Sequence, residues 1–194
     1  MARGAVRAAM RAGLRALCDT RGVAAVEMAV AAPLLLTFFC GVGEMSLFLT
    51  AHYQAGQMAS TVADVVARYE RVTRDDIQSI FQVSSTVMGE DDFAANGHVI
   101  LSSVARAANS TRTRVAWQCG GGGALEAESR VGTIGGDAVL PGDLLLEPED
   151  NVIVAEVFYD YAPTLGFVRM PDAIFYKTTV FRPRLGALTT APGC

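Results

Sequence analysis

Few residues in this sequence have the types and spacings that carry out chemistry. The two histidines, His52 and His98, lie in no HExxH zinc motif, no Ser-His-Asp set and no nucleophile elbow. No CxxC pair and no Cys/His spacing suitable for zinc is present. His52 takes an apolar position of a predicted helix, so we expect it to pack against its neighbours. The sequence therefore predicts no enzymatic activity, metal, cofactor or small-molecule substrate. A hydrolase with an unrecognised site is the rival, and a pocket of convergent titratable groups would favour it.

Two polar segments resemble binding loops without matching one. Ser84 and Ser85 precede the acidic run 90–92, but the spacing fits no calcium loop, and we interpret the acids as a solvated turn. The four glycines at 120–123 lack the lysine and the strand-to-helix context of a phosphate loop. We interpret them as a flexible connector.

The charge is distributed unevenly along the chain. Residues 1–22 hold five arginines and one aspartate, a net charge of +4, whereas residues 52–194 hold eleven basic and seventeen acidic residues, a net charge of −6. A basic start, an apolar band and an acidic remainder are typical of a chain that crosses a membrane once with its N-terminus in the cytoplasm. The acidic main segment has no basic stripe and gives no support to nucleic-acid binding.

The apolar band runs from Val23 to Ala51 and is interrupted by two charged residues, Glu27 and Glu44. A transmembrane helix needs about 20 apolar residues, whereas the apolar core of a cleaved signal peptide has roughly 7 to 15. The length favours a membrane anchor. Arginines recur every fourth residue before it, at Arg3, Arg7, Arg11 and Arg15, which also resembles an organellar transit peptide, although such a peptide does not need to adjoin a membrane span.

The two glutamates are the unusual residues of this band, because a charge deep in lipid costs about 2.5 to 3.5 kcal/mol on insertion scales. We place Glu27 at the cytoplasmic headgroup level, where the cost falls away. Glu44 lies near the outer interface of a tilted helix, or is neutralised by protonation or by a partner helix. At about 100° per residue the two side chains lie roughly a quarter-turn apart, so they need not serve one partner.

The cysteines sort by compartment. With the N-terminus inside, Cys18 lies on the reducing side and Cys40 lies in the span, which leaves Cys119 and Cys194 in an oxidising space where a disulfide is stable. Such a bond would stabilise the fold by roughly 4 kcal/mol. Two free thiols, or a Cys194 that pairs between molecules, are the alternatives.

Two helices and four strands are expected to carry these residues. One long helix runs from Val23 to about Tyr69, and its second half is an amphipathic stem. The apolar face of the stem comprises Met45, Phe48, His52, Ala55, Ala59, Val62, Val66 and Tyr69. Thr73 and Asp76 form a capping box that opens a second helix, which Gly89 ends.

Alternation of apolar residues predicts a hairpin over 98–107 and 112–119, and strands over 151–161 and 173–182, with Pro163 and Pro171 in the last connection. The fold class is α+β: a long membrane-anchored helix, a short second helix and a small antiparallel sheet. The domain division is a basic leader at 1–22, a transmembrane helix at 23–51, a helical stem with the second helix at 52–89, and an exterior β domain at 90–194.

The start of this helix carries a recognisable pattern. Arg21-Gly22 is followed by VAAVE ending at Glu27, then by an apolar run through Pro33 to Gly43-Glu44. Over residues 21–63 this resembles the TadE/TadF-like minor pseudopilins of tight-adherence (Tad, Flp type IVb) pilus systems. A late YDY strand and the FRPR segment at 181–184 are loosely similar. Met28 departs from the aromatic residue that often follows the glutamate.

The resemblance implies that a prepilin peptidase cuts after Gly22, so that Val23 becomes the first residue and Glu27 the fifth. The new α-amino group of Val23 could pair with Glu27 of a neighbouring subunit and set the register of packed helices. Small residues, mainly alanines, allow close helix approach, and Pro33 weakens the helix by removing a backbone donor. Glu44 is the second residue that we assign to helix assembly.

The function implied is that of a pilin-like subunit for pilus biogenesis and adhesion, in a system related to type II secretion. Its partners would be the peptidase, other pilins and pseudopilins, and the assembly platform. The expected location is the bacterial inner membrane with the C-terminal domain in the periplasm, or outside the cell if the subunit enters the fibre. The alternative is an uncut single-pass scaffold of a secretion or pilus machine with an exterior protein-binding domain.

Overall fold

The computed structural model describes residues 21–163 and 173–194. The arginines at positions 3, 7, 11 and 15, Cys18 and Pro171 lie outside these residues. The described chain divides into two compact units, one ending at Met45 and the other beginning at Ser46. The long helix α2 (Arg21–Val66) contributes to both and contains Pro33.

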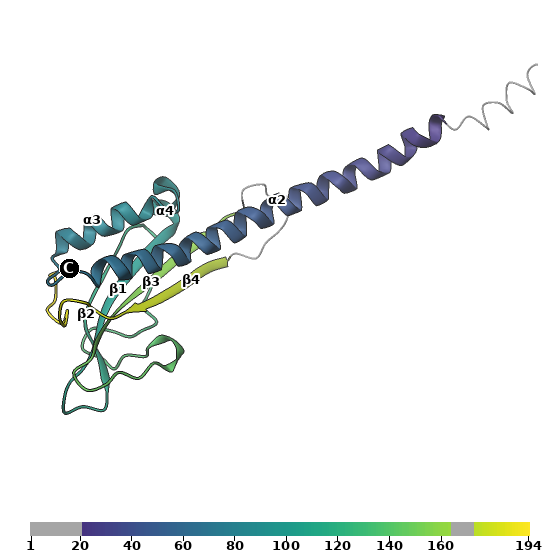
Figure 1. The fold of residues 1–194 in the computed structure, drawn as a ribbon. Coiled ribbons are helices and arrows are strands. Elements are labelled where there is room, and N and C mark those ends of the chain that lie inside the picture. The colour runs from purple at the N-terminus through teal and green to yellow at the C-terminus, as the bar shows by residue number, and fades with distance from the viewer. Residues whose placement is uncertain (1–20, 164–172) are drawn as a thin grey trace, which may run out of the picture. The chain divides into compact units, whose positions relative to one another are not determined.

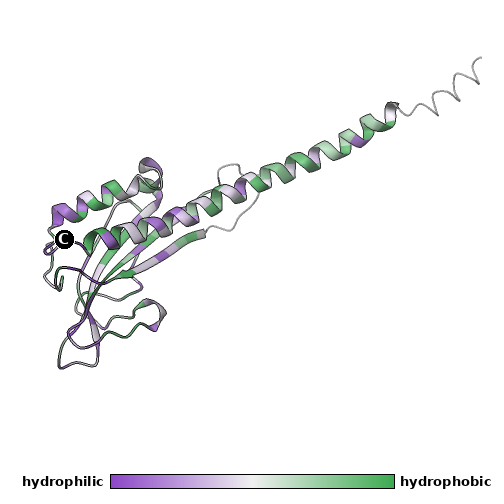
Figure 2. Ribbon diagram, viewed as in Figure 1, coloured by the Kyte–Doolittle hydropathy of each residue, from purple (hydrophilic) through white to green (hydrophobic). Residues whose placement is uncertain are grey.

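The first unit contains the apolar part of α2. Figure 2 shows hydrophobic residues on this part of the helix. By length and composition α2 is the one helix of the described residues that could cross a membrane. Large apolar side chains are exposed here, as a lipid solvent would allow: Val23, Val26, Met28, Val30, Leu34, Leu35, Leu36, Phe38, Phe39 and Val42.

The second unit is an antiparallel sheet covered by helices on one face (Figure 1). Its strands are β1 (Gly97–Arg106), β2 (Thr113–Gly121), β3 (Asn151–Tyr161) and β4 (Ala173–Phe181), in the spatial order β2-β1-β3-β4. The shorter helices are α3 (Arg74–Ser85) and α4 (Glu90–Asn96), and η1 (Pro141–Asp143) is a single 3-10 turn. The predicted α+β architecture is confirmed, and each expected strand is present within two residues of its expected bounds.

The core on the helical face joins the stem to the sheet. Ala55, Ala59, Val62 and Val66 of the predicted stem face are fully buried against residues such as Leu101 and Val157. Met45 of that face is exposed, contrary to the prediction, and His52 is exposed although its ring packs 5.2 Å from that of Phe175. α2 also ends three residues before the expected end at Tyr69, since the amides of Arg68 and Tyr69 bond carbonyls three residues back instead of four.

A β-bulge changes which residues of β2 face each side of the sheet. Ser103 pairs with Trp117 and Val104 with Val115, so Ala116 is an extra residue on β2. Trp117 therefore packs on the helical face, while Val115 joins a smaller core on the other face. Residues 131–146 of the β2–β3 connection cover that second core with Val131, Leu140 and Leu146.

Three expectations for the segments around the second helix and the glycine run are wrong. The acids at 90–92 begin α4 instead of a solvated turn, and the second helix ends at Ser85, before Gly89. The glycines at 120–123 are not a flexible connector, because Gly120 and Gly121 belong to β2. A Cβ on Gly123 would lie 2.2 Å from the Gly97 carbonyl oxygen, so glycine is needed for this close backbone approach.

Candidate functional site

The residues assigned to processing and assembly lie in the first unit, on α2. Gly22 and Glu27 are exposed, and Val23 is 54% exposed. Apart from its chain neighbours and the backbone of its own helix, no atom of the described residues lies within 4 Å of the position that a Cβ on Gly22 would take. α2 begins at Arg21, so the Gly22–Val23 peptide is helical. Glycine lowers the cost of unwinding this turn, because it is about 1 kcal/mol less favourable than alanine in a helix.

Glu44 has different surroundings from Glu27. Its exposed fraction is 1%, and it is among the largest fully buried side chains of the described residues. Glu27, seventeen positions earlier on the same helix, is exposed. The structure thus separates the two carboxyl groups by environment, as their angular offset on the helix allows.

The first turns of the stem pack on the ends of β3 and β4. The Phe48 ring lies 5.4 Å from that of Tyr161 and 5.0 Å from that of Phe175, in edge-to-face arrangements. His52 lies one turn after Phe48 on α2. Its Nε2 atom is 2.6 Å from Nζ of Lys177 on β4. His52 is therefore exposed but in contact with the edge strand, which agrees with a packed rather than ligating histidine.

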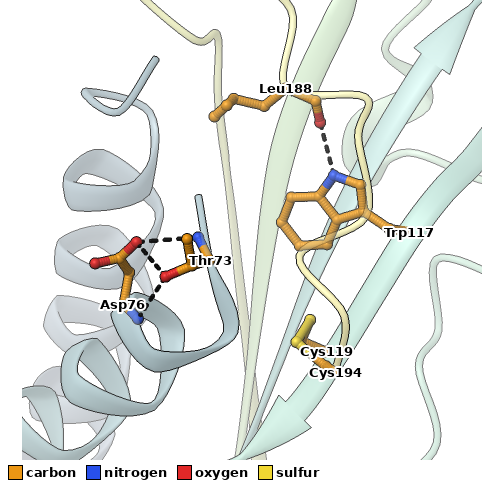
Figure 3. The surroundings of a disulfide bond; sticks show 6 residues. All are labelled: Thr73, Asp76, Trp117, Cys119, Leu188 and Cys194. Carbon is orange, nitrogen blue, oxygen red and sulfur yellow. Dashed lines mark hydrogen bonds between the residues drawn. A yellow bond between two sulfur atoms is a disulfide. The ribbon is translucent and has the colours of Figure 1, made fainter. Parts of the chain in front are cut away.

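The C-terminal segment is held to the sheet and the stem at three places. Cys119 on β2 and Cys194 form a disulfide with 5.5 Å between their Cα atoms. The Leu188 carbonyl accepts hydrogen bonds from Trp117 Nε1 and Ser103 Oγ, each at 2.7 Å. Figure 3 shows Trp117, Leu188 and the disulfide together on the helical face of the sheet.

The third place is an ion pair with the end of α2. Arg184 lies 2.6 Å from Asp64, which also bonds Arg68, and the Arg184 amide donates to the Ala67 carbonyl. The hydrogen bond from Arg68 and the charges of both arginines lower the pKa of Asp64. The FRPR segment therefore closes the C-terminal end of the stem, where α2 leaves carbonyl groups without helical partners.

The expected capping box is present at the start of α3. Thr73 Oγ1 lies 2.6 Å from Asp76 Oδ2, the Thr73 amide donates to the same carboxylate at 3.0 Å, and the Asp76 amide donates back to Thr73 Oγ1 at 3.3 Å (Figure 3). The bonds from the Thr73 hydroxyl and amide lower the pKa of Asp76.

A buried carboxylate on the second face of the sheet was not anticipated. Glu156 of β3 is fully buried and accepts hydrogen bonds from Ser129 Oγ, from the Arg130 amide at 2.9 Å and from the Tyr176 hydroxyl at 2.8 Å. The Arg130 guanidinium lies 4.2 Å from the centre of the Tyr176 ring. The signal in the sequence is a lone glutamate in the middle of the apolar strand NVIVAEVFYDY.

One cavity of the second unit brings a histidine and a serine together without pairing them. His98, Glu128 and Ser129 line one cavity of about 420 Å³. Ser129 donates to Glu156, however, and His98 Nδ1 lies 3.5 Å from the Gly123 carbonyl oxygen. Among the described residues no hydrogen bond joins a serine or cysteine to a histidine, so the pairing of nucleophile and base is not formed there.

Comparison with known proteins associates the first part of this chain with a family. Residues 22–64 match the TadE-like protein family. No curated protein and no solved structure matches the chain. The match confirms the resemblance carried by Gly22, Glu27 and the apolar run, over residues 22–64 of the chain.

Proposed function

We propose, from the premise that residues 22–64 are a TadE-like segment, that this protein is a minor pilin-like subunit for biogenesis of a Tad/Flp-type pilus. In this role it is cut after Gly22 by a prepilin peptidase and joins other pilins and the assembly platform through α2. Its contribution is structural rather than catalytic.

The observation that carries this proposal is the combination of an uncovered apolar helix with an exposed carboxylate near its start. The apolar side chains of the first unit are exposed, which suits contact with lipid or with other helices. Glu27 is exposed on the same helix, five residues after Gly22, and so is accessible to a neighbouring subunit. An amine on Val23 would supply the opposite charge at the same depth.

The proposed topology keeps the division stated from the sequence. Residues 1–22 form a cytoplasmic leader, 23–51 span the bacterial inner membrane, 52–89 form the stem and second helix, and 90–194 form an exterior domain in the periplasm. The Cys119–Cys194 disulfide supports an oxidising location for that domain.

Intact mass of the full chain purified from membranes tests the cleavage. We expect the loss of residues 1–22 from the wild type and full retention in Gly22→Phe, because a bulky side chain replaces the residue before the cut. Ala24→Val is the matched control and should be cut normally. Normal cutting of Gly22→Phe, or an uncut wild type, would contradict the assignment of the cleavage site after Gly22.

A second experiment tests the role of Glu27 in assembly. Glu27→Gln keeps the shape of the side chain but removes the charge that would meet the Val23 amine. We expect the exterior domain to fold normally and pilus formation to be impaired in a strain that depends on this subunit. Glu70→Gln, at another exposed glutamate, should leave pili unchanged. Normal piliation with Glu27→Gln would exclude the pairing.

One observation favours the alternative of an uncut scaffold. The Gly22–Val23 peptide lies inside α2, so it must unwind before a peptidase can bind it in an extended form. If the mature protein retains its leader and still co-purifies with pilus components, the scaffold function replaces that of a processed subunit.

A further inference from the structure

Residues 49–60 of the stem and the edge strand β4 line a groove that contains a lysine, a histidine and a tyrosine. Its volume is about 610 Å³, and its lining includes Leu49, His52, Tyr53, Gln57 and Lys177. All of these residues belong to the second unit. Leu49 and Tyr53 are 57% and 67% exposed.

Lys177 is the only lysine of the chain. Each ion pair of the described residues uses an arginine, and no carboxylate of this part of the chain lies within 4.0 Å of Lys177 Nζ. Its neighbour at 2.6 Å is His52 Nε2, which accepts a hydrogen bond from the ammonium group when this nitrogen is unprotonated. Two N–H groups of Lys177 are then left for an anionic ligand.

Tyr53 supplies a second donor at the same groove. Gln57 Nε2 donates to the Tyr53 hydroxyl oxygen at 2.8 Å. Because that oxygen already accepts a hydrogen bond, its own hydrogen is available to another acceptor. An ammonium group and a phenolic hydroxyl above an exposed leucine suit a ligand with an anionic oxygen group and an apolar body.

The position along α2 identifies the source of such a ligand. If Glu27 lies at the cytoplasmic headgroup level, a hydrocarbon layer of about 30 Å ends about 20 residues later, near Leu47, at 1.5 Å per residue. His52 then lies roughly 8 Å further, within the layer of lipid headgroups. Tyrosine is enriched at this level, and lysine extends its ammonium group toward it.

We propose that this groove binds the phosphate of a phospholipid headgroup in the outer leaflet, with preference for an anionic lipid. Lys177 and Tyr53 hold the phosphate, His52 and Gln57 orient these two side chains, and Leu49 contacts the start of the acyl chains. The proposal rests on the membrane insertion stated under the proposed function. It implies that the exterior domain is fixed against the membrane surface by β4 as well as by its helix.

The test uses the full chain reconstituted in vesicles of equal parts phosphatidylglycerol and phosphatidylcholine. After extraction into dodecyl maltoside, native mass spectrometry counts the retained lipids. We expect about tenfold enrichment of phosphatidylglycerol over phosphatidylcholine, because phosphatidylcholine brings a choline cation toward the Lys177 ammonium group and phosphatidylglycerol does not. Lys177→Gln should abolish the enrichment and Lys177→Arg should keep it. Arg71→Gln, which removes an exposed cation elsewhere, should not change it.

A second readout does not depend on lipid counting. Because Lys177 is the only lysine, its acylation by an amine-reactive ester, separated from acylation of the N-terminal α-amino group by peptide mapping, reports on the groove. We expect slower acylation in the phosphatidylglycerol vesicles than in detergent, and no slowing on addition of inorganic phosphate. Protection by inorganic phosphate alone would reassign the groove to a soluble anion and overturn the lipid proposal.

Resistance to alkaline extraction separates the two proposals. A wild-type protein that resists extraction but retains both lipids equally would overturn the headgroup site while leaving the pilin-like function standing. A protein that is extracted by alkali was never inserted, which would overturn both.

Discussion

The buried Glu156 and the half-buried Tyr176 form a hydrogen-bonded pair on neighbouring strands. The Tyr176 hydroxyl donates to Glu156 at 2.8 Å. Burial, and then the hydrogen bond and charge of Glu156, raise the pKa of Tyr176 from 10.0 to about 12. The folded state thus favours the neutral phenol. The stability that the folded state gains from the raised pKa of Tyr176 is fully present below pH 10 and is lost as the pH rises from 10 towards 12.

We predict that Glu156→Gln moves the ionisation of Tyr176 to lower pH, because the phenolate no longer meets a carboxylate. Burial remains, so the pKa should stay above 10.0. Ultraviolet titration of tyrosinate measures the shift, and Tyr176→Phe identifies the step that belongs to this residue. A titration that Tyr176→Phe leaves unchanged near pH 12 would show that the pair is not formed.

The glycines at 120–123 are an element-scale feature that sequence reasoning misjudged. They extend β2 and pass close beneath α3 and α4, where a Cβ on Gly121 would lie 3.1 Å from the Phe81 ring. Glycine-rich composition predicts flexibility only when nothing packs on the backbone, and the packing partners come from distant segments. The seven residues of α4 were missed for a related reason, since so short a helix depends on tertiary contacts.

Gly123→Ala should destabilise the protein by about 1–3 kcal/mol, as overpacking of a tight contact usually does. Its Cβ would meet two backbone oxygens, that of Gly97 at 2.2 Å and that of Phe93 at 2.5 Å, which cannot rotate away. Thermal unfolding of the full chain in detergent measures the loss. Gly56→Ala is the control, because its Cβ would meet only Lys177 Cδ, at 4.0 Å, and should not lower the melting temperature. An unaffected Gly123→Ala protein would contradict this packing.

The regular elements were more accessible to prediction than the contacts between them. β3 begins and ends at the predicted residues, because its β-branched and aromatic run is bounded by polar residues and Pro163. The stem was predictable because its small apolar residues recur at helical spacing. Glu156, the Leu188 carbonyl and the groove at Lys177 could not be predicted, since each joins side chains or backbone groups far apart in the sequence.

At the scale of the whole molecule, the disulfide closes a loop with a sequence separation of 75 residues. The expected compartments favoured a pairing of Cys119 with Cys194 but left two free thiols or an intermolecular bond open, and the structure has the intramolecular bond. The hydrogen bonds from Trp117 and Ser103 to Leu188 could not be predicted, and they hold the same segment independently of the cysteines.

Cys119→Ser with Cys194→Ser should lower the free energy of unfolding by roughly 4 kcal/mol, the chain-entropy value for a loop of this length. The segment should nevertheless stay in place, because Leu188 and Arg184 keep their partners. Denaturant unfolding with and without a reductant measures the change in the free energy of unfolding. The fluorescence of Trp117, which reports whether its side chain remains buried, shows whether the C-terminal segment stays in place. A reductant that exposes Trp117 at once would show that the disulfide alone holds the segment.

The extra residue at Ala116 makes the sheet more sensitive to changes in chain length than to changes in side chains. Removing this one position would exchange the orientations of everything on one side of it, so that either Trp117 and Cys119 or Val115 would point away from its core. In a mutational scan of β2, single-residue deletions at Ala116 should therefore be far less tolerated than any exchange of its methyl group for another small side chain.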